Sequence, residues 1–549
     1  MRATMMDFPL SLNHIVEQAA RVHAKKEIVS QAPDKSLRRH TYADLLRRSR
    51  GLAKALMDAG LKPGERVATL MWNHHAHVET YFGVPMAGGV YHTLNLRLAP
   101  QDLIYIANHA EDRFLIVDDT LWKLYAAIKA HVNFERVFIV RWDDSPVPEG
   151  AEDYETFVQA GIDDAWVAPA VDENQAAGMC YTSGTTGRPK GVVYSHRSLV
   201  LHSLASALPS TLSLRESDIA LPVVPMFHVN AWGLPFTLTL VGATMVMPGP
   251  HLQPDALLDL YVKEKVTMSA GVPTIWMGIL QLLEAHPERW KDRAENIRMI
   301  VGGAAAPAAM VTGLDKHNLT VVHAWGMTET SPLGTASTLK GYLLDAPEDV
   351  QLSARIKQGW PAPFVEIRGR SEDGLIPWDG KAMGELEVRG PWVAASYYNL
   401  PDAADQWTPD GWFRTGDVVT IDDQGYMKIM DRTKDLIKSG GEWISSQDLE
   451  NAIMAHPSIA EAAVVAIPHP RWQERPLAAV VVKKGQTLDK AALHTFLSER
   501  FAKWWLPDGY VQLDEIPRNS TGKFLKMELR NTYQSWTPGE GDPGAPGDK

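Results

Sequence analysis

Apolar positions along the chain follow two periods that alternate. From Thr41 to Gly60 they repeat with the spacing of one helix face, and the threonine and the glycine suit the two ends of that helix. Short apolar runs at 67–70, 114–117 and 137–140 are typical of buried strands. Strands that alternate with helices predict a mostly parallel sheet covered by helices.

The same alternation returns in the middle of the chain. Strands are predicted at 267–270, 298–301 and 320–323, and each leads into a helix start or a turn. Two of these turns are rich in glycine or in polar residues. In open α/β sheets, ligands bind at the carboxyl ends of the strands. The pattern therefore predicts a ligand site at this edge of the sheet.

Two later regions have a different character. Between 350 and 430 the pattern changes to short strands and turns, which indicates a β-rich subdomain. Further on, helices are predicted at 446–456 and 489–501, and strands at 463–467 and 478–482. A second, smaller domain is therefore expected at the C-terminal end.

The sequence as a whole predicts an α/β protein. Residues 1–430 are expected to form a large N-terminal domain with mostly parallel sheets and the β-rich subdomain. Residues 431–536 are expected to form a small α+β C-terminal domain, and the tail at 537–549, rich in proline and glycine, is expected to be disordered.

Composition excludes some partners. The chain has 549 residues and a net charge of −12, which argues against a general binder of nucleic acid or of anionic membranes. Its one cysteine, Cys180, excludes an intramolecular disulfide. The N-terminus lacks the apolar segment of a signal peptide. We expect a cytoplasmic location.

One uncharged stretch, 219–250, has to be compared with a membrane span. It is interrupted by prolines and by polar side chains, namely Pro222, Pro225, Pro235, His228 and Asn230. Because a lone span in mid-chain without basic flanks is improbable, we expect no integral membrane span. The stretch instead predicts buried strands and a helix that line a ligand pocket.

The densest chemical signal is the segment 181–192, Tyr-Thr-Ser-Gly-Thr-Thr-Gly-Arg-Pro-Lys-Gly-Val. Glycines let the backbone approach a ligand, while hydroxyls, backbone N–H groups and a lysine can hold anionic oxygens. The spacing differs from a Walker P-loop, which requires Gly-Lys-Ser/Thr after its four-residue gap. A polar surface loop is the alternative. The phosphate-binding candidates are Thr182, Ser183, Gly184, Thr185, Thr186, Gly187 and Lys190.

This segment resembles the signature loop of the adenylate-forming enzymes, which include acyl-CoA synthetases, luciferases and the adenylation domains of peptide synthetases. Six motifs occur in the family's order between Tyr181 and Lys523. Over the whole chain, the resemblance is to the fatty acyl-CoA synthetases, particularly the bacterial medium- and long-chain branch. It implies that residues 1–430 bind ATP and the acyl group and that the small domain, 431–536, is mobile.

The resemblance assigns a nucleotide-binding role to residues after two predicted strands. A turn beside adenine would contain Gly303, Ala304 and Ala305. The segment His323-Ala324-Trp325-Gly326-Met327-Thr328-Glu329 resembles the motif whose aromatic residue stacks on adenine and whose glutamate binds Mg²⁺. The family usually has tyrosine where this chain has Trp325. Read without the family, a pair such as Thr328-Glu329 is more often a helix start. The implied metal ligands are Glu329 and Thr185.

Two later motifs complete the implied site. Asp417, in Gly411 to Asp417, would accept hydrogen bonds from the ribose hydroxyls, with a plain turn as the alternative. In the charged segment 431–443, Asp431 would be the hinge and Arg432 would contact the ribose. Without the resemblance, this segment has the composition of a solvated linker. Gly440 and Gly441 would line the pantetheine tunnel, and the further cofactor-binding candidates are Lys434, Lys438 and Trp443.

The remaining candidates act on the reacting groups. A carboxylate has to attack an α-phosphate that is already anionic, so positive charge must be placed on the developing charge. The resemblance assigns this catalytic role to Lys523, together with Mg²⁺ at Glu329. It places His228 between the acyl pocket and the route of the thiol, as a catalytic and substrate-binding residue, and Trp232 at an aromatic gate.

The implied reaction has two steps. A fatty carboxylate and MgATP give acyl-AMP and pyrophosphate, and the thiol of coenzyme A then gives acyl-CoA and AMP. The alternatives are a CoA ligase for a short or substituted acid, such as a methylthio-alkanoate or an aryl acid, and an acyl-AMP ligase with another acceptor. A catalytically silent binding protein is a third. A homodimer is expected by analogy only.

Overall fold

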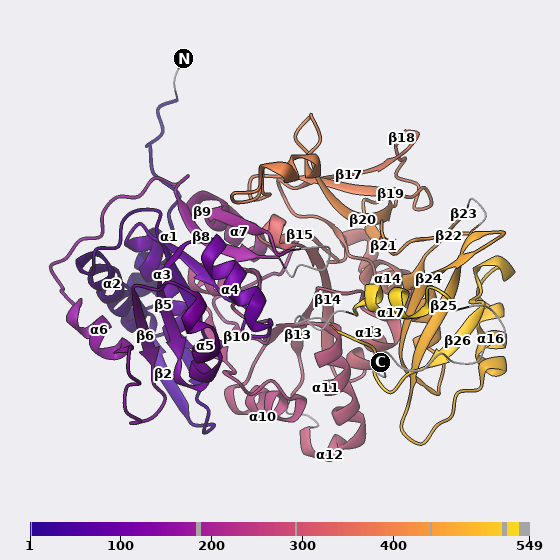
Figure 1. Ribbon diagram of the computed structural model, residues 1–549, viewed down its shortest axis with the longest axis horizontal. Coiled ribbons are helices and arrows are strands. Elements are labelled where there is room, and N and C mark those ends of the chain that lie inside the picture. The colour runs from indigo at the N-terminus through magenta and orange to yellow at the C-terminus, as the bar shows by residue number, and fades with distance from the viewer. Residues whose placement is uncertain (2, 183–187, 291–293, 440–441, 519–523, 537–549) are drawn as a thin grey trace.

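The computed structural model describes residues 1, 3–182, 188–290, 294–439, 442–518 and 524–536 (Figure 1). Several predicted site residues lie outside this described part of the chain, namely Ser183, Gly184, Thr185, Thr186, Gly187, Gly440, Gly441 and Lys523, as does the tail at 537–549.

The first half of the chain builds a seven-stranded sheet. Every neighbouring pair is parallel except the last, β8 with β9. In spatial order the strands are β7 (Glu152–Asp153), β6 (Arg136–Val140), β5 (Asp112–Asp118), β3 (Arg66–Leu70), β4 (Val90–Thr93), β8 (Ala176–Tyr181) and β9 (Gly191–Ser195).

A nine-stranded sheet draws its strands from more distant segments. It is parallel from β14 to β1 and antiparallel at both edges. Its order is β16 (Trp360–Pro361), β15 (Leu333–Ala336), β14 (Leu319–Gly326), β13 (Ile297–Val301), β12 (Met268–Gly271), β10 (Ile219–Pro222), β11 (Thr244–Met247), β1 (Glu27–Gln31) and β2 (Leu37–Thr41).

Helices cover and separate these two sheets. All residues of α3 are buried, and one continuous apolar core contains side chains from strands of both sheets, such as Val67 and Met268. The α-helices of the large domain are α1 (Leu12–Val22), α2 (Tyr42–Asp58), α3 (His75–Met86), α4 (Pro100–His109), α5 (Trp122–Ile128), α6 (Tyr154–Ala160), α7 (His196–Ala207), α8 (Val229–Trp232), α9 (Leu234–Val241), α10 (Pro254–Glu264), α11 (Pro273–Ala285), α12 (Pro287–Trp290), α13 (Ala308–Asp315) and α14 (Glu348–Arg355).

The β-rich subdomain is an antiparallel sheet of five strands, drawn in orange in Figure 1. Its order is β18 (Gly374–Leu375), β17 (Glu366–Ser371), β19 (Gly384–Arg389), β20 (Phe413–Ile421) and β21 (Met427–Arg432). The 3₁₀ turns of the chain are η1 (Asp119–Leu121), η2 (Lys129–His131), η3 (Thr328–Thr330), η4 (Gly341–Leu343), η5 (Pro401–Gln406) and η6 (Lys503–Trp505).

The C-terminal domain, at the yellow end of the colour scale in Figure 1, has a sheet with an apolar core on each face. The sheet runs β23 (Glu442–Ile444), β22 (Ile437–Ser439), β25 (Gln473–Val482) and β24 (Ile459–His469), and β26 (Gly509–Gln512) pairs with β25. Its helices are α15 (Ser446–Met454), α16 (Lys490–Ser498) and α17 (Lys526–Tyr533).

The architecture confirms the predicted α/β class and the periods from which it was inferred. Helix α2 starts where the pattern placed it, because Thr41 Oγ1 accepts from the N–H of Asp44 and the Asp44 carboxylate accepts from the N–H of Thr41. The predicted strands all occur. The uncharged stretch 219–250 forms β10, α8, α9 and β11, and among the described residues no helix is long and apolar enough to cross a membrane.

Candidate active site

Side chains from three sheets meet beside the carboxyl end of β14. The indole Nε1 of Trp325, near the end of that strand, donates to Oδ2 of Asp417 on β20 across 2.9 Å. The hydroxyl of Tyr194, on β9, donates to the carbonyl oxygen of Thr328 across 2.8 Å. The segment after β14 is therefore joined to both the seven-stranded sheet and the β-rich subdomain.

Asp417 lies within a strand and not in a turn. It faces Arg432 across the β20–β21 pair, and Arg432 Nε lies 2.8 Å from Asp417 Oδ1. The Asp417 side chain is only 4% exposed, whereas that of Arg432 is 38% exposed. The carboxylate is therefore fixed, while the guanidinium has access to solvent. A fixed carboxylate can accept hydrogen bonds from a diol.

Glu329 is also a buried carboxylate with defined partners. The Tyr397 hydroxyl donates to Glu329 Oε1 across 2.5 Å, and the N–H of Ala394 donates to the Glu329 carbonyl oxygen across 2.7 Å. Burial, and then the charge of Glu329, raise the pKa of Tyr397 above its usual value. The phenol is therefore a donor at neutral pH.

The two ends of the predicted phosphate loop meet. The N–H of Thr182 donates to the Lys190 carbonyl oxygen across 2.9 Å, and the N–H of Lys190 donates to Thr182 Oγ1 across 3.1 Å. The ammonium group of Lys190 lies 4.9 Å from the centre of the Tyr397 ring. Because Tyr397 holds Glu329, the loop closes next to the glutamate.

His323 joins the two predicted adenine segments. Its Nε2 lies 3.3 Å from the carbonyl oxygen of Ala304, and its Nδ1 lies 3.2 Å from that of Ile356. Burial lowers the pKa of His323 to about 4, so the ring is neutral at pH 7. Gly303 has a φ of 81°, and Ala304 is exposed. The turn thus presents backbone to solvent at the end of β13.

The segment after His228 forms a left-handed turn. Five consecutive residues, Val229 to Gly233, have φ between 38° and 72°. Left-handed geometry costs a residue with a side chain about 1 kcal/mol or more. Such strain is concentrated at functional sites and persists only where the surroundings enforce it. His228 lies at the start of this turn and is half-buried.

Two close contacts hold the turn. A Cβ atom on Gly233 would lie 2.7 Å from the ring of His202, and a Cβ on Gly302 would lie 3.0 Å from the ring of Trp232. Trp232, half-buried, therefore packs on the glycine that precedes the predicted adenine turn. The structure brings together Trp232 and Gly302, residues that are far apart in sequence.

His202 itself is a buried acceptor. The N–H of Leu333 donates to its Nε2 across 3.1 Å, which requires the proton of the neutral ring to be on Nδ1. Burial lowers the pKa of His202 to about 3.

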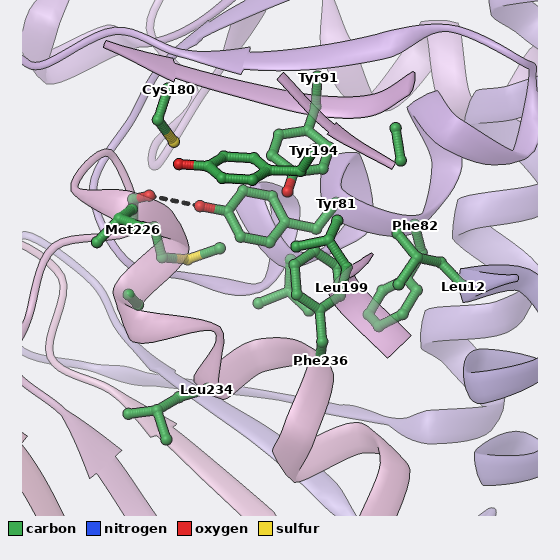
Figure 2. Close-up of a cluster of buried hydrophobic side chains, with 14 of the residues drawn as sticks. Leu12, Tyr81, Phe82, Tyr91, Cys180, Tyr194, Leu199, Met226, Leu234 and Phe236 are labelled. Carbon is green, nitrogen blue, oxygen red and sulfur yellow. Dashed lines mark hydrogen bonds between the residues drawn. The ribbon is translucent and has the colours of Figure 1, made fainter. Parts of the chain in front are cut away.

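Aromatic side chains fill the space beside the left-handed turn (Figure 2). The rings of Tyr81 and Tyr91 stack with centroids 4.6 Å apart, and Phe236 of α9 stacks on Tyr81 at 5.3 Å. The Tyr81 hydroxyl donates to the carbonyl oxygen of Met226. Cys180 is fully buried, and burial raises the pKa of its thiol to about 11. It is therefore a core residue with no thiolate at neutral pH.

The predicted coenzyme A residues lie on the C-terminal domain. Lys438 and Trp443 face each other across the β22–β23 pair, with the Lys438 ammonium 4.3 Å from the ring centre. Lys434 is exposed, and its carbonyl oxygen accepts from Arg530 of α17. Strands β22 and β23 belong to the sheet of the C-terminal domain, whereas Asp417 lies in the sheet of the β-rich subdomain.

Contacts across Asp431 join the two domains. Asp431 Oδ2 accepts from the N–H of Ser446, the first residue of α15, across 2.7 Å. Lys428 Nζ lies 2.8 Å from Asp448 Oδ1, and the Ser445 hydroxyl donates to the Met430 carbonyl oxygen. The predicted hinge residue therefore also accepts a hydrogen bond from the first backbone N–H of α15.

A divalent cation fits the chemistry of Glu329. Mg²⁺ prefers few protein carboxylates and takes its other ligands from phosphate oxygens and water. Within the described residues no cluster of three or more histidine, cysteine or acidic side chains could hold a metal. One buried carboxylate whose Oε1 is held by a phenol is consistent with a metal that binds together with a nucleotide.

Two contributors to the site had no signal in the sequence. Tyr397 and Tyr194 belong to no motif, and only the fold places their hydroxyl groups at Glu329 and Thr328.

Two family models match the chain. The model for AMP-binding enzymes matches residues 16–398, and the model for the C-terminal domain of AMP-binding enzymes matches residues 448–523.

Curated relatives match over nearly their whole length. The chain is 47% identical to a long-chain-fatty-acid–CoA ligase of Thermus thermophilus, over 98% of each chain. It is 45% identical to a 3-methylmercaptopropionyl-CoA ligase of Ruegeria lacuscaerulensis, over 97% of this chain and 99% of the relative. It is 43% identical to a medium-chain-fatty-acid–CoA ligase of Ectopseudomonas oleovorans, over 97% and 98%.

The fold also matches solved structures. The crystal structure of ATP-bound MatB from Rhodopseudomonas palustris superposes with a TM-score of 0.80 at 28% identity, covering 95% of this chain and 99% of that one.

Proposed function

The chain belongs to the family of AMP-binding enzymes, and we propose that it joins a medium- or long-chain fatty acid to coenzyme A. Its activity class is AMP-forming acid–CoA ligation, with ATP and coenzyme A as cosubstrates. Beyond this class, the identity of the acid, the roles of individual residues and the use of a metal ion are proposed.

The observation that carries the proposal is the meeting of Trp325, Glu329 and Asp417 beside β14. A buried carboxylate held by an indole and a guanidinium suits a ribose diol, and a second buried carboxylate held by a phenol suits the phosphate end of a nucleotide. Tyr397 contacts both ends of this arrangement, because Lys190 lies over its ring and Glu329 accepts from its hydroxyl.

In the first step, an oxygen of the substrate carboxylate attacks the α-phosphorus of ATP, and pyrophosphate leaves. The backbone of Gly303 to Ala305 and the ring of Trp325 hold adenine, Asp417 and Arg432 hold the ribose, and Thr182 to Lys190 hold the β- and γ-phosphates. Lys523, outside the described residues, supplies positive charge to the α-phosphate. Glu329 and Thr185 would hold Mg²⁺, which neutralises phosphate charge when it is bound.

In the second step, the thiol sulfur of coenzyme A attacks the acyl carbonyl carbon and AMP leaves. The small domain rotates about Asp431, so that Lys523 withdraws and the segment with Gly440, Gly441 and Trp443 approaches. Lys434 and Lys438 contribute positive charge towards coenzyme A. His228 lies between the acid and the thiol route.

The acid is assigned from the stretch 219–250 and from the relatives. Trp232, on the left-handed turn against Gly302, stands at the entrance to an apolar acid site. Two of the relatives named above act on long- and medium-chain fatty acids, which favours a fatty acid. The 3-methylmercaptopropionyl-CoA ligase, at comparable identity, favours the second candidate, a short acid with a methylthio substituent.

Three further properties belong to this proposal. The protein uses Mg²⁺, acts in the cytoplasm and forms a homodimer. The buried carboxylate of Glu329 and the single cysteine support the first two, and the third rests on analogy.

A series of carboxylic acids tests the proposal. The release of AMP is measured with and without coenzyme A for straight-chain acids from two to eighteen carbons, 3-methylthiopropionate and benzoate. The proposal expects CoA-dependent release with the highest kcat/KM at medium or long chain length. A maximum at 3-methylthiopropionate would select the second candidate, and AMP release that does not depend on coenzyme A would indicate an acyl-AMP ligase.

A further inference from the structure

The carboxylate of Asp417 has a protein partner on each of its oxygens. Arg432 Nε lies 2.8 Å from Oδ1, and Trp325 Nε1 lies 2.9 Å from Oδ2. Each carboxylate oxygen offers a second lone pair. Two hydroxyl groups of a diol can therefore still bind, one on each oxygen, in directions set by the two partners.

The two partners of Asp417 differ in exposure to solvent and in packing. The Arg432 side chain is 38% exposed, while Trp325 is only 6% exposed. A Cβ atom on Gly334 would lie 2.4 Å from the six-membered ring of Trp325, so the indole rests directly on that glycine. The indole is thus held by packing on one side and by Asp417 at its N–H, and it is the rigid partner of the carboxylate.

We infer that Trp325 is a positioning residue for the ribose: its indole N–H fixes the Asp417 carboxylate so that both ribose hydroxyls can donate to it. This rests on the proposed binding of ATP at Asp417. The N–H at the edge of the Trp325 ring then orients the carboxylate that binds the ribose, while the face of the ring makes the adenine contact assigned above. Its effect on the sugar requires Asp417.

Nucleotides that lack one hydroxyl group separate these two roles. In Trp325→Phe, which keeps an aromatic face and loses the N–H, kcat/KM for ATP should fall about tenfold, as expected for one hydrogen bond to a charged group. For 2′-deoxyATP and 3′-deoxyATP the fall should be about twofold or less. The preference for ATP over each deoxynucleotide should therefore decrease about fivefold.

A matched control comes from a second buried tryptophan. Trp392 is 2% exposed, and its Nε1 donates to the carbonyl oxygen of Leu333 across 2.9 Å. Trp392→Phe removes an equivalent N–H near the site, so it should lower the melting temperature by a similar amount and leave the preference for ATP over 3′-deoxyATP unchanged.

A double-mutant cycle tests the route through Asp417. In Asp417→Ala the ribose preference should already be lost, and adding Trp325→Phe should change it by less than twofold. The inference is wrong if Trp325→Phe lowers kcat/KM for ATP and for 3′-deoxyATP by the same factor. It is also wrong if the variant lowers the preference for ATP to the same extent with and without Asp417. Should the phenylalanine variant fail to fold, Trp325→Met, which also lacks a donor, is measured in its place. The loss of the aromatic face then affects ATP and the deoxynucleotides alike, so the ratio of their kcat/KM values still decides the inference.

Binding measurements separate this inference from the proposed function. Calorimetric titration with AMP and with 3′-deoxyAMP needs no acid and no turnover. If AMP binds but no acid supports AMP release, the proposed ligase function fails, while the ratio of the two Kd values in wild type and Trp325→Phe still decides the inference. Equal Kd values for both nucleotides in the wild type would overturn it.

Discussion

The hydroxyl of Tyr397 donates to Oε1 of Glu329 across 2.5 Å, although 68 residues separate the two in the chain. Lys190, at the end of the predicted phosphate loop, lies over the same tyrosine ring at 4.9 Å. Tyr397 thus connects the loop to the carboxylate that is proposed to bind the metal.

Removing that hydroxyl should weaken the use of Mg²⁺. In Tyr397→Phe, Glu329 remains buried but loses the donor that orients it, so the Mg²⁺ concentration for half-maximal ATP–pyrophosphate exchange should rise about three- to tenfold. Tyr398→Phe is the neighbouring control and should leave that concentration unchanged. An unaltered Mg²⁺ dependence in Tyr397→Phe would show that the phenol does not orient the carboxylate.

Replacing the proposed catalytic lysine should separate the two half-reactions. Lys523→Ala should slow adenylate formation by about a hundredfold or more, because charge stabilisation at the phosphate is lost. It should spare thioester formation from supplied acyl-AMP, measured by quenched flow. Lys484→Ala, which removes an exposed lysine of the same domain, should affect neither half-reaction. Equal losses in both half-reactions would refute this role for Lys523.

Trp232 should influence which acid is used. It packs against Gly302 at the end of the left-handed turn, so Trp232→Ala opens space beside the proposed entrance of the acid. The kcat/KM profile across acids of two to eighteen carbons should shift its maximum, while KM for coenzyme A changes less than twofold. Trp443→Ala should raise KM for coenzyme A and leave the acid profile unchanged. An identical acid profile in Trp232→Ala would place the acid elsewhere.

Acid should destabilise the protein through His202. Its pKa in the folded state, about 3, lies below the value of about 6.5 expected when unfolded. Between these values the unfolded chain binds more protons, so stability that is complete above pH 6.5 is lost as the pH falls towards 3. By pH 5.5 the loss from this group is about 1 kcal/mol.

The variant His202→Gln isolates this contribution from those of other buried histidines. It keeps an acceptor for the N–H of Leu333 but cannot be protonated in this range. Thermal unfolding measured from pH 7.5 to 5.0 should show a shallower loss of stability in the variant than in the wild type. Parallel curves would mean that His202 is not the neutral acceptor that the geometry requires.

Local patterns were sufficient for the elements but not for the contacts between them. The helix at Thr41 and the buried strands follow from period and capping, which are properties of neighbouring residues. Asp417 was recognised through its motif, yet nothing local indicates its two partners. The contact with Arg432 depends on the register of β20 with β21, and the contact with Trp325 depends on how two sheets approach each other. Tyr397 was missed for the same reason.

The left-handed turn shows a different limit. Val229, Ala231 and Trp232 have no preference for positive φ, and a sequence pattern would place them in an ordinary helix or strand. The turn packs against His202 at Gly233 and against Gly302 at Trp232, and both partners come from other parts of the chain. Lys523 and the loop at 183–187 lie outside the described residues, and their roles stay predictions.

The carboxylate of Asp431 has a consequence for the speed of the catalytic cycle. It accepts from the first N–H of α15, on the other side of the proposed pivot, and Lys428 and Ser445 make two more contacts across the same point. A domain that rotates there has to break the hydrogen bond from the Ser446 N–H to Asp431, which costs about 1 kcal/mol. If the proposed rotation occurs, the orientation seen in the structure is a resting position, and we expect the rate at which the domain leaves it to set an upper bound on turnover.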